Sequence, residues 1–384
     1  MVTLRSIVTP VAIVRLVLGW GVFLALALAG PLLEPPVPAP LLIIALVIIV
    51  AIILVCAFGV VHEAEHLARR LGDPYGSLVL TLSIVLIEVV LIAAVMLGPG
   101  EHATIARDSV MAVSMIILNA VIGLSLLVGG IARGGRRPNR TGVLLYLAML
   151  IVLSSLAFAL PALIGEDGSY TTGQQIPIIV LTVALYAFFL FRQMGRQADD
   201  FREVDSLPAS VASESQTDAS PHARVSVLRV IAQHRAEIVT RLLLLIVTVV
   251  PIVLLSHDMA ALLDDGLGRA GAPVALSGIL IAMIVFLPES ITSVRAALRG
   301  EIQRVSNLCH GALVSTVGLT IPAVLIIGAL TGQTVVLAEN LTNLMLLGVT
   351  FLLSVATFMA KKVTAVHGAA HLVVFAVYGL TVFA

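Results

Sequence analysis

Long apolar stretches separated by short polar turns recur along the whole 384-residue chain. A membrane-spanning helix needs about 20 predominantly apolar residues. By this measure the sequence predicts about eleven transmembrane helices, centred near Phe23, Ala51, Ile87, Val121, Leu153, Ala184, Ile246, Met283, Gly318, Leu347 and Val373. We therefore expect an all-α, polytopic membrane protein.

Composition supports the same class of protein. Hydrophobic residues make up 59% of the chain and charged residues 11%, whereas about a quarter of the residues of soluble domains are charged. The net charge is zero, so nothing indicates a nucleic-acid partner. The expected partners are the lipid bilayer, inorganic cations and protons, and the sequence leaves open whether the protein forms a homo-oligomer.

Arginine and lysine gather in every second loop between the predicted spans. If the N-terminus is cytoplasmic, nearly all of them fall in inner loops, and the outer loops hold only Arg107 and Arg269. This asymmetry is typical of membrane proteins and predicts that orientation. The first span could instead be a cleaved signal peptide, because a short basic start precedes it; we favour a retained helix.

One long polar segment divides the chain into two parts. We expect an extra N-terminal helix within residues 1–32, a first five-helix repeat in 40–196, a hydrophilic cytoplasmic linker in 197–235 and a second repeat in 236–384. A weak internal match aligns Asn119 with Thr316. Because Glu289 lies five spans after Glu88, the repeats should be inverted, as in many secondary transporters.

Lone carboxylates occupy matching spans of these repeats, at Glu88 and Glu289. An ionisable side chain within the bilayer is costly and by default marks a functional site; either glutamate could instead be structural, protonated or paired with an arginine. Carboxylates, hydroxyls and carbonyls are hard ligands that suit Ca²⁺ or Na⁺. The polar residues that could support such a site are Thr81, Asn119, Thr292, Ser293, Ser315 and Thr316.

A transport mechanism follows from the charge of this pair. Two carboxylates facing each other in a low-dielectric site repel, and either a cation or two protons cancels their charge. An empty, doubly negative site should resist crossing between outward and inward states. The sequence thus predicts exchange of a cation for protons, with the metal held by Glu88 and Glu289 as substrate and with no resident cofactor.

Two segments carry a family resemblance: EHLARRLGDPYGSLVLTLSIVLIEVVLI and FLPESITSVRAALRGEIQRVSNLCHGALVSTVGLTIPAV. They resemble the α-repeats of calcium/proton antiporters of the ChaA/CAX type, in the cation/calcium exchanger superfamily. The resemblance implies a bacterial cytoplasmic-membrane antiporter in which Glu88 and Glu289 bind Ca²⁺ and protons. It also implies that Na⁺ or K⁺ can replace Ca²⁺. Eukaryotic-type members carry Gly-Asn where Ile84-Val85 and Val285-Phe286 stand here, which leaves the ranking of Ca²⁺ against Na⁺ or K⁺ open.

A rival function is an intramembrane zinc metalloprotease, because residues 62–66 read HEAEH and match the H-E-x-x-H motif. The candidate third ligands, Asp264 and Asp265, should lie on the opposite side of the membrane from His62, which argues against a zinc site. A cation channel is a further alternative. Within the motif, Glu63 and Glu65 could instead form a cytoplasmic mouth that attracts cations.

Further polar residues have simpler interpretations. The linker acids Asp199, Asp200, Glu203 and Asp205 are typical of a solvated loop; the family resemblance implies that they could be a regulatory Ca²⁺ sensor. His367 and His371 could be a metal pair or a proton relay, but an interfacial polar stripe is the simpler interpretation. We expect His310 to be a core histidine.

Overall fold

The computed structural model describes residues 7–33, 36–71, 103–204, 227–273 and 275–383. Between residues 72 and 102 it describes only Leu82, Val85, Glu88, Val89, Ile92, Ala93 and Met96. The third predicted span, including Thr81, therefore lies largely outside the described residues. Within the described part every regular element is helical, apart from isolated bridges such as Arg136 with Val363.

The described helices occur in the following order along the chain. They are α2 (Pro10–Leu28), η1 (Gly30–Leu32), α3 (Ala39–Leu71), α5 (Ile105–Met115), η2 (Ile116–Val121), α6 (Ile122–Arg133), α7 (Arg140–Ser154), η3 (Ser155–Ala159), α8 (Leu160–Ile164), α9 (Thr172–Met194), η4 (Ala198–Phe201), α10 (Val227–Arg269), α11 (Ala275–Val285), α12 (Leu287–Arg299), α13 (Ile302–Thr331), α14 (Leu341–Met359) and α15 (Ala365–Val382). Elements η2 and η3 are π-helical turns inside longer helices.

Nine of the described helices are long and apolar enough to cross a membrane, and a bent pair makes a tenth. The all-α polytopic architecture that the sequence predicts is confirmed. Helix α10 begins at Val227, inside the stretch expected to be linker, and has one non-helical residue at His234. The sequence VLRVIAQ explains the early start, because its apolar residues recur at helical spacing.

The bent pair carries one of the two candidate glutamates. Helices α11 and α12 meet at an angle of 54° between Ile284 and Leu287. Pro288 lies in the first turn of α12 and has no backbone N–H to donate to the preceding turn. Pro288 therefore accounts for the break between α11 and α12.

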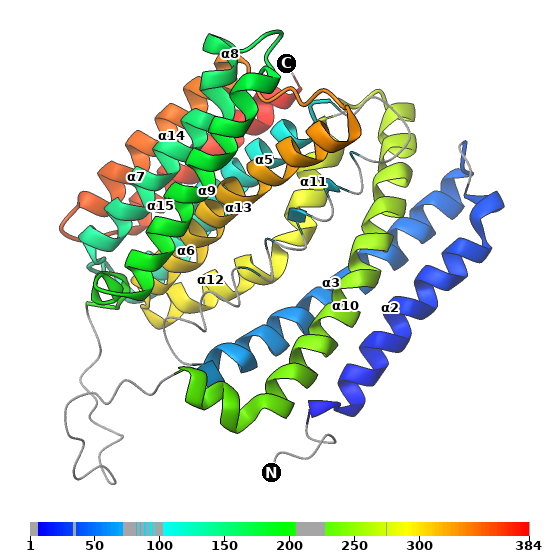
Figure 1. The fold of residues 1–384 in the computed structure, drawn as a ribbon, viewed down its shortest axis with the longest axis horizontal. Coiled ribbons are helices and arrows are strands. Elements are labelled where there is room, and N and C mark those ends of the chain that lie inside the picture. The colour runs from blue at the N-terminus through cyan, green and yellow to red at the C-terminus, as the bar shows by residue number, and fades with distance from the viewer. Residues whose placement is uncertain are drawn as a thin grey trace.

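The buried apolar residues form two separate cores. One core joins α2, α3 and α10 and contains residues such as Ile49, Ile53 and Leu255. The other joins α5 to α9 with α11 to α15. Figure 1 shows α2, α3 and α10 on one side of the molecule and the larger bundle on the other, with α11 and α12 between them.

Helices α3 and α10 run antiparallel and are joined by polar contacts at both ends. At one end the backbone N–H of Val37 donates to Asp265 Oδ2 at 3.1 Å, and Arg269 donates to the Val37 carbonyl at 2.5 Å. At the other end Arg241 Nη1 lies 2.6 Å from Glu63 Oε2. These contacts hold the two helices in one register.

Close backbone contacts fix α6 between α15 and α12. A Cβ atom added to Gly368 of α15 would lie 2.3 Å from the Leu127 nitrogen of α6. A Cβ atom at Gly129 of α6 would lie 2.9 Å from the Ala297 carbonyl of α12. Only glycine permits both approaches, so α6 positions the helix that carries Glu289.

Candidate cation site

Glu88 is buried, with 4% of the residue exposed, and its carboxylate accepts one hydrogen bond from a distant part of the chain. Its Oε2 accepts from the hydroxyl of Thr316 on α13 at 2.5 Å. Its Oε1 is buried and has no hydrogen-bond partner among the described residues. The structure therefore brings together two of the residues predicted for the site and leaves one carboxylate oxygen available.

Glu289 lies in the first turn of α12, directly after the break. Its Oε2 is also buried without a hydrogen-bond partner in the described part of the chain. The N-terminal turn of a helix has unsatisfied backbone N–H groups and a partial positive charge, both of which favour a carboxylate. The break at Pro288 thus creates a location that tolerates this acid in an apolar span.

The hydroxyls predicted around Glu289 are committed to other partners. Thr292 donates to the carbonyl of Pro288 at 2.9 Å. Ser293, which is fully buried, lies 3.3 Å from the Cys309 sulfur on α13. Ser293 therefore joins α12 to the helix that carries Thr316.

Asn119 and Ser315 point toward other helices. The Asn119 amide nitrogen donates to Thr350 of α14 at 2.9 Å, and its oxygen lies 3.2 Å from His371 Nδ1 of α15. Ser315 donates to the Gly311 carbonyl and accepts from Tyr186 of α9, both at 2.9 Å. Neither side chain has a hydrogen bond to Glu88 or Glu289 within the described structure.

His310, His367 and His371 differ from one another in their surroundings. His367 caps the start of α15, where its Nδ1 accepts from the Thr364 backbone at 3.1 Å. His371 is fully buried, so the interpretation of both as an interfacial stripe is wrong for this residue. His310 is buried in the core, between the rings of Tyr146 and Phe358.

The HEAEH segment lies at the end of α3 far from Asp265. Glu63 is 6% exposed and pairs with Arg241, so it is not a charge facing water as a cytoplasmic mouth requires. The side chain of Glu65 lies outside the described residues. Asp265 contacts Val37, which is separated from Glu63 by about 36 Å of helix. Zinc ligands must meet at one ion, and the described residues contain no group of three side chains able to hold a metal.

Sequence reasoning missed the buried ion cluster around Arg241. This guanidinium contacts Glu63 at 2.6 Å and Glu237 at 3.3 Å, and all three residues are buried. The spacing of Glu237 and Arg241, four residues apart on one helix, was the available signal. Their partner on α3 could not be identified, because it lies 178 residues earlier.

The linker acids have specific contacts where the structure describes them. Glu203 Oε2 accepts from the backbone N–H of Gln303 at 2.9 Å and so caps the start of α13. Burial raises the pKa of Glu203, and the backbone hydrogen bonds oppose this shift. Asp199 pairs with Arg202 at 2.8 Å, and the backbone of Asp200 lies against Gly142. Asp205 lies outside the described residues.

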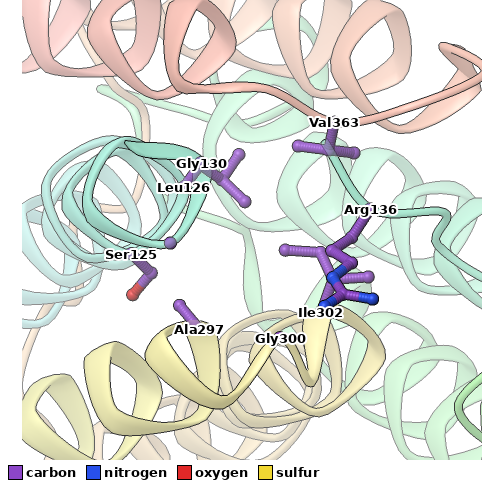
Figure 2. Close-up of a pocket in the computed structure, with 9 residues that line it drawn as sticks. Ser125, Leu126, Gly130, Arg136, Ala297, Gly300, Ile302 and Val363 are labelled. Atoms are coloured by element: carbon purple, nitrogen blue, oxygen red, sulfur yellow. The ribbon is translucent and has the colours of Figure 1, made fainter. Parts of the chain in front are cut away.

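A small cavity lies between α6 and α12, about 12 Å of helix beyond Glu289. Figure 2 shows two of its lining residues, Ser125 on one side and Arg136 on the other, with Ala297 and Gly300 below them. The Ser125 hydroxyl and Arg136 Nε are buried without hydrogen-bond partners among the described residues. The volume of this cavity is about 10 Å³, which suits a single water molecule at most.

Comparisons with known proteins identify the family of this chain. Residues 41–195 and 240–384 match the model of the sodium/calcium exchanger protein family. The chain is 31% identical over 332 residues to the sodium-potassium/proton antiporter ChaA of Escherichia coli (strain K12), which covers 86% of this chain and 87% of that protein.

Solved structures show the same fold at low identity. The H⁺/Ca²⁺ exchanger CAX matches with a TM-score of 0.67 and 14% identity, covering 96% of this chain and 88% of that one. The Ca²⁺/H⁺ antiporter protein YfkE matches with a TM-score of 0.63 and 14% identity, covering 97% and 98%. The chain described here is thus a multi-pass membrane protein that belongs to the sodium/calcium exchanger family, a family of transporters and not of enzymes.

Proposed function

We propose that this protein is a secondary active antiporter that exports Ca²⁺, Na⁺ or K⁺ in exchange for protons. The cation binds at a midplane site formed by Glu88, Glu289 and Thr316, which we call the glutamate site. The observation that carries the proposal is that both glutamates lie in membrane spans predicted from the sequence and have a buried carboxylate oxygen with no hydrogen-bond partner among the described residues. The relative ChaA is named for sodium, potassium and protons, and the fold neighbour CAX for H⁺ and Ca²⁺.

The pairing of α12 with α13 supports a single site. Helix α12 leads through the turn at Gly300 into α13, so the two helices run antiparallel, and Ser293 contacts Cys309. Glu289 lies four residues, or about one turn, before Ser293, and Leu313 lies four residues after Cys309, so Glu289 and Leu313 are at the same height in this antiparallel pair. Thr316, which binds Glu88, is only three residues or about 4.5 Å further along α13.

The charge of the two glutamates then couples the movement of the cation to the movement of protons. With no cation and no protons, two carboxylates share a poorly hydrated site, where their repulsion is strong. Either a bound cation or bound protons remove that repulsion. The site therefore crosses the bilayer loaded with one or the other, and the empty site crosses slowly.

The proposed organisation assigns residues 40–196 and 236–384 to two inverted repeats, joined by a cytoplasmic linker and preceded by the extra helix within 1–32. The two stretches that match the family model, 41–195 and 240–384, support this division. The arginine distribution supports a cytoplasmic N-terminus. The E. coli relative supports the bacterial cytoplasmic membrane as the location.

The test is proton-coupled cation flux in proteoliposomes that contain a pH-sensitive dye. Wild-type protein should collapse an imposed proton gradient when Ca²⁺, Na⁺ or K⁺ is added. We expect Glu88→Gln and Glu289→Gln to abolish this exchange, because one negative charge is lost in each. Glu166→Gln is the matched control, since Glu166 is an exposed glutamate in the turn after α8. Normal exchange by either site variant would refute the two-glutamate site.

The same assay separates an antiporter from a channel. In an antiporter, cation movement requires a proton movement in the opposite direction. A channel conducts cations down their own gradient when both sides have equal pH and protons cannot move. Cation flux under those conditions would contradict the proposed coupling.

The acidic linker is proposed as a regulatory element, with Asp199, Asp200, Glu203 and Asp205 as its acids. The Glu203 cap on α13 supports this role, because α13 also carries Thr316. Replacing Asp199, Asp200 and Asp205 by asparagine, while keeping the Glu203 cap on α13, should remove any activation by Ca²⁺ on the linker side. Unchanged activation in this triple variant would dismiss the linker acids as the sensor.

A further inference from the structure

A buried polar network connects Asn119 to α14 and α15 and leaves it with a fixed orientation. Thr350 donates its hydroxyl proton to the Leu346 carbonyl at 2.8 Å. Its oxygen can then only accept, and it accepts from the Asn119 amide nitrogen at 2.9 Å. The Asn119 oxygen must consequently face His371 Nδ1, 3.2 Å away.

This orientation also determines the role of His371. An amide oxygen can only accept, so His371 Nδ1 carries the proton and donates it to Asn119. The other ring nitrogen, Nε2, lies 3.2 Å from the Thr357 hydroxyl, which can donate to it. Asn119, Thr350, Thr357 and His371 are all fully buried, so water does not compete for these hydrogen bonds.

The repeat relationship makes the orientation of Asn119 unexpected. Asn119 aligns with Thr316, and Thr316 reaches the glutamate of the opposite repeat. By the same relation Asn119 should reach Glu289, and its element η2 indeed contacts α12. Instead, Glu289 Oε2 has no partner among the described residues while the Asn119 carbonyl is bound by His371.

The chemistry of the cations indicates which one binds less tightly when the Asn119 carbonyl is not available as a ligand. An amide carbonyl is a hard oxygen ligand of the kind that Ca²⁺ uses, and Ca²⁺ takes six to eight oxygens. A monovalent cation loses less hydration free energy on binding and needs fewer oxygens from the protein. Withholding one carbonyl therefore weakens Ca²⁺ binding more than Na⁺ or K⁺ binding.

We infer that His371 is a specificity-determining positioning residue that holds the Asn119 carbonyl away from the glutamate site and so disfavours Ca²⁺ relative to Na⁺ and K⁺. This inference rests on the proposed function and adds the substrate preference of the same site. Residue 371 acts through Asn119 and does not itself contact the transported ion. Thr350 contacts only the nitrogen of the same amide, so the donor on residue 371 is what binds the carbonyl oxygen.

The experiment compares half-saturating concentrations of Ca²⁺ and Na⁺ for proton-coupled exchange in proteoliposomes. His371→Leu removes the donor, and we expect the preference for Ca²⁺ over Na⁺ to rise about tenfold. His371→Asn places an amide N–H at the position of Nδ1 and should restore the wild-type ratio. Adding Asn119→Leu to His371→Leu should cancel the gain, because the released carbonyl is then absent.

Controls keep the outcome decisive. Ser354→Ala removes a buried hydroxyl from α14 that has no partner among the described residues, and it should leave the ratio unchanged. If His371→Leu does not fold, His371→Gln replaces it, since its longer amide reaches the Nε2 position and leaves Asn119 without its donor. An unchanged ratio in a folded, exchanging His371 variant would overturn the inference, as would a gain that persists without Asn119. Failure of the proposed function is distinct, because wild-type protein would then show no proton-coupled exchange of any cation.

Discussion

Glu88 and Thr316 are 228 residues apart in the sequence and are joined by a buried hydrogen bond of 2.5 Å. The bond connects the one charged residue described in its apolar span to the centre of α13, which carries no acid of its own. Glu289, the corresponding acid of the second half, has no such donor among the described residues. The two carboxylates are therefore unequal in their surroundings, although they occupy matching positions in the sequence.

Removing the Thr316 hydroxyl should weaken cation binding. Hydrogen bonds to charged groups contribute about 1.5–3 kcal/mol, and each 1.4 kcal/mol corresponds to a factor of about ten in affinity. We expect Thr316→Val to raise the half-saturating concentration of the exported cation about tenfold or more. Thr316→Ser keeps the donor and should stay within about twofold of wild type. Equal effects of the two substitutions would show that the hydroxyl itself is unimportant.

Arg241 should be essential for stability. Its guanidinium neutralises Glu63, and the side chains of both are less than a tenth exposed. Removing one member of a buried ion pair destabilises proteins by about 3–5 kcal/mol, because an uncompensated charge remains. We expect Arg241→Met to lower the thermal unfolding temperature in detergent markedly. The double variant Arg241→Met with Glu63→Gln should recover part of the loss, and a lack of recovery would contradict this pairing.

The Glu203 cap should make stability depend on pH. Burial raises the pKa of this carboxyl, against the opposing effect of the Gln303 backbone N–H and the further raising effect of Glu301. A group with a raised pKa contributes its full stability below its ordinary pKa, and that contribution falls as the pH rises through the raised value. Glu203→Gln keeps an acceptor without the charge, so it should unfold at a higher temperature than wild type at neutral pH.

Two further measurements complete this test. The difference between Glu203→Gln and wild type should vanish below the ordinary pKa of glutamate, where the carboxyl is protonated in both folded and unfolded protein. Glu203→Ala removes the acceptor and should be less stable than Glu203→Gln at every pH, by about 1 kcal/mol. A glutamine variant that is less stable than wild type at neutral pH would mean that the ionised carboxylate is favourable here.

The contact between α6 and α15 should not tolerate an added methyl group. A Cβ atom at Gly368 would meet the Leu127 nitrogen at 2.3 Å and the Gly123 carbonyl at 2.5 Å, both of them backbone atoms. Overpacking of this kind destabilises by about 1–3 kcal/mol. Gly379, on the same helix, has nothing within 4 Å of an added Cβ. Gly379→Ala should therefore be neutral or slightly stabilising, whereas Gly368→Ala should lower the unfolding temperature.

The helices and the two glutamates were predictable because each is a local signal. An apolar run of about 20 residues indicates a span wherever it occurs, and a single acid within such a run is visible without any partner. Pro288 is also a local signal, because proline interrupts the hydrogen bonds of a helix, and the break between α11 and α12 lies directly before it. These features depend on neighbouring residues alone.

The surroundings of the glutamates were less predictable because they depend on distant residues. Thr316 was expected near the site, yet so were Asn119 and Ser315, whose side chains turn toward other helices. The π-helical turn at Ile116–Val121 has no proline or glycine to indicate it. The partner that orients Asn119 lies 252 residues further along the chain, and sequence reasoning assigned it to the interface.

The presence of two apolar cores bears on how the molecule can move. Because α2, α3 and α10 bury their side chains largely among themselves, tilting this trio against the remaining helices would uncover little of either interior. The hydrogen bond at one end of α3 and α10 and the salt bridge at the other end oppose sliding of these two helices past each other. We therefore expect α2, α3 and α10 to move together as one rigid body, with the hinge at α11 and α12.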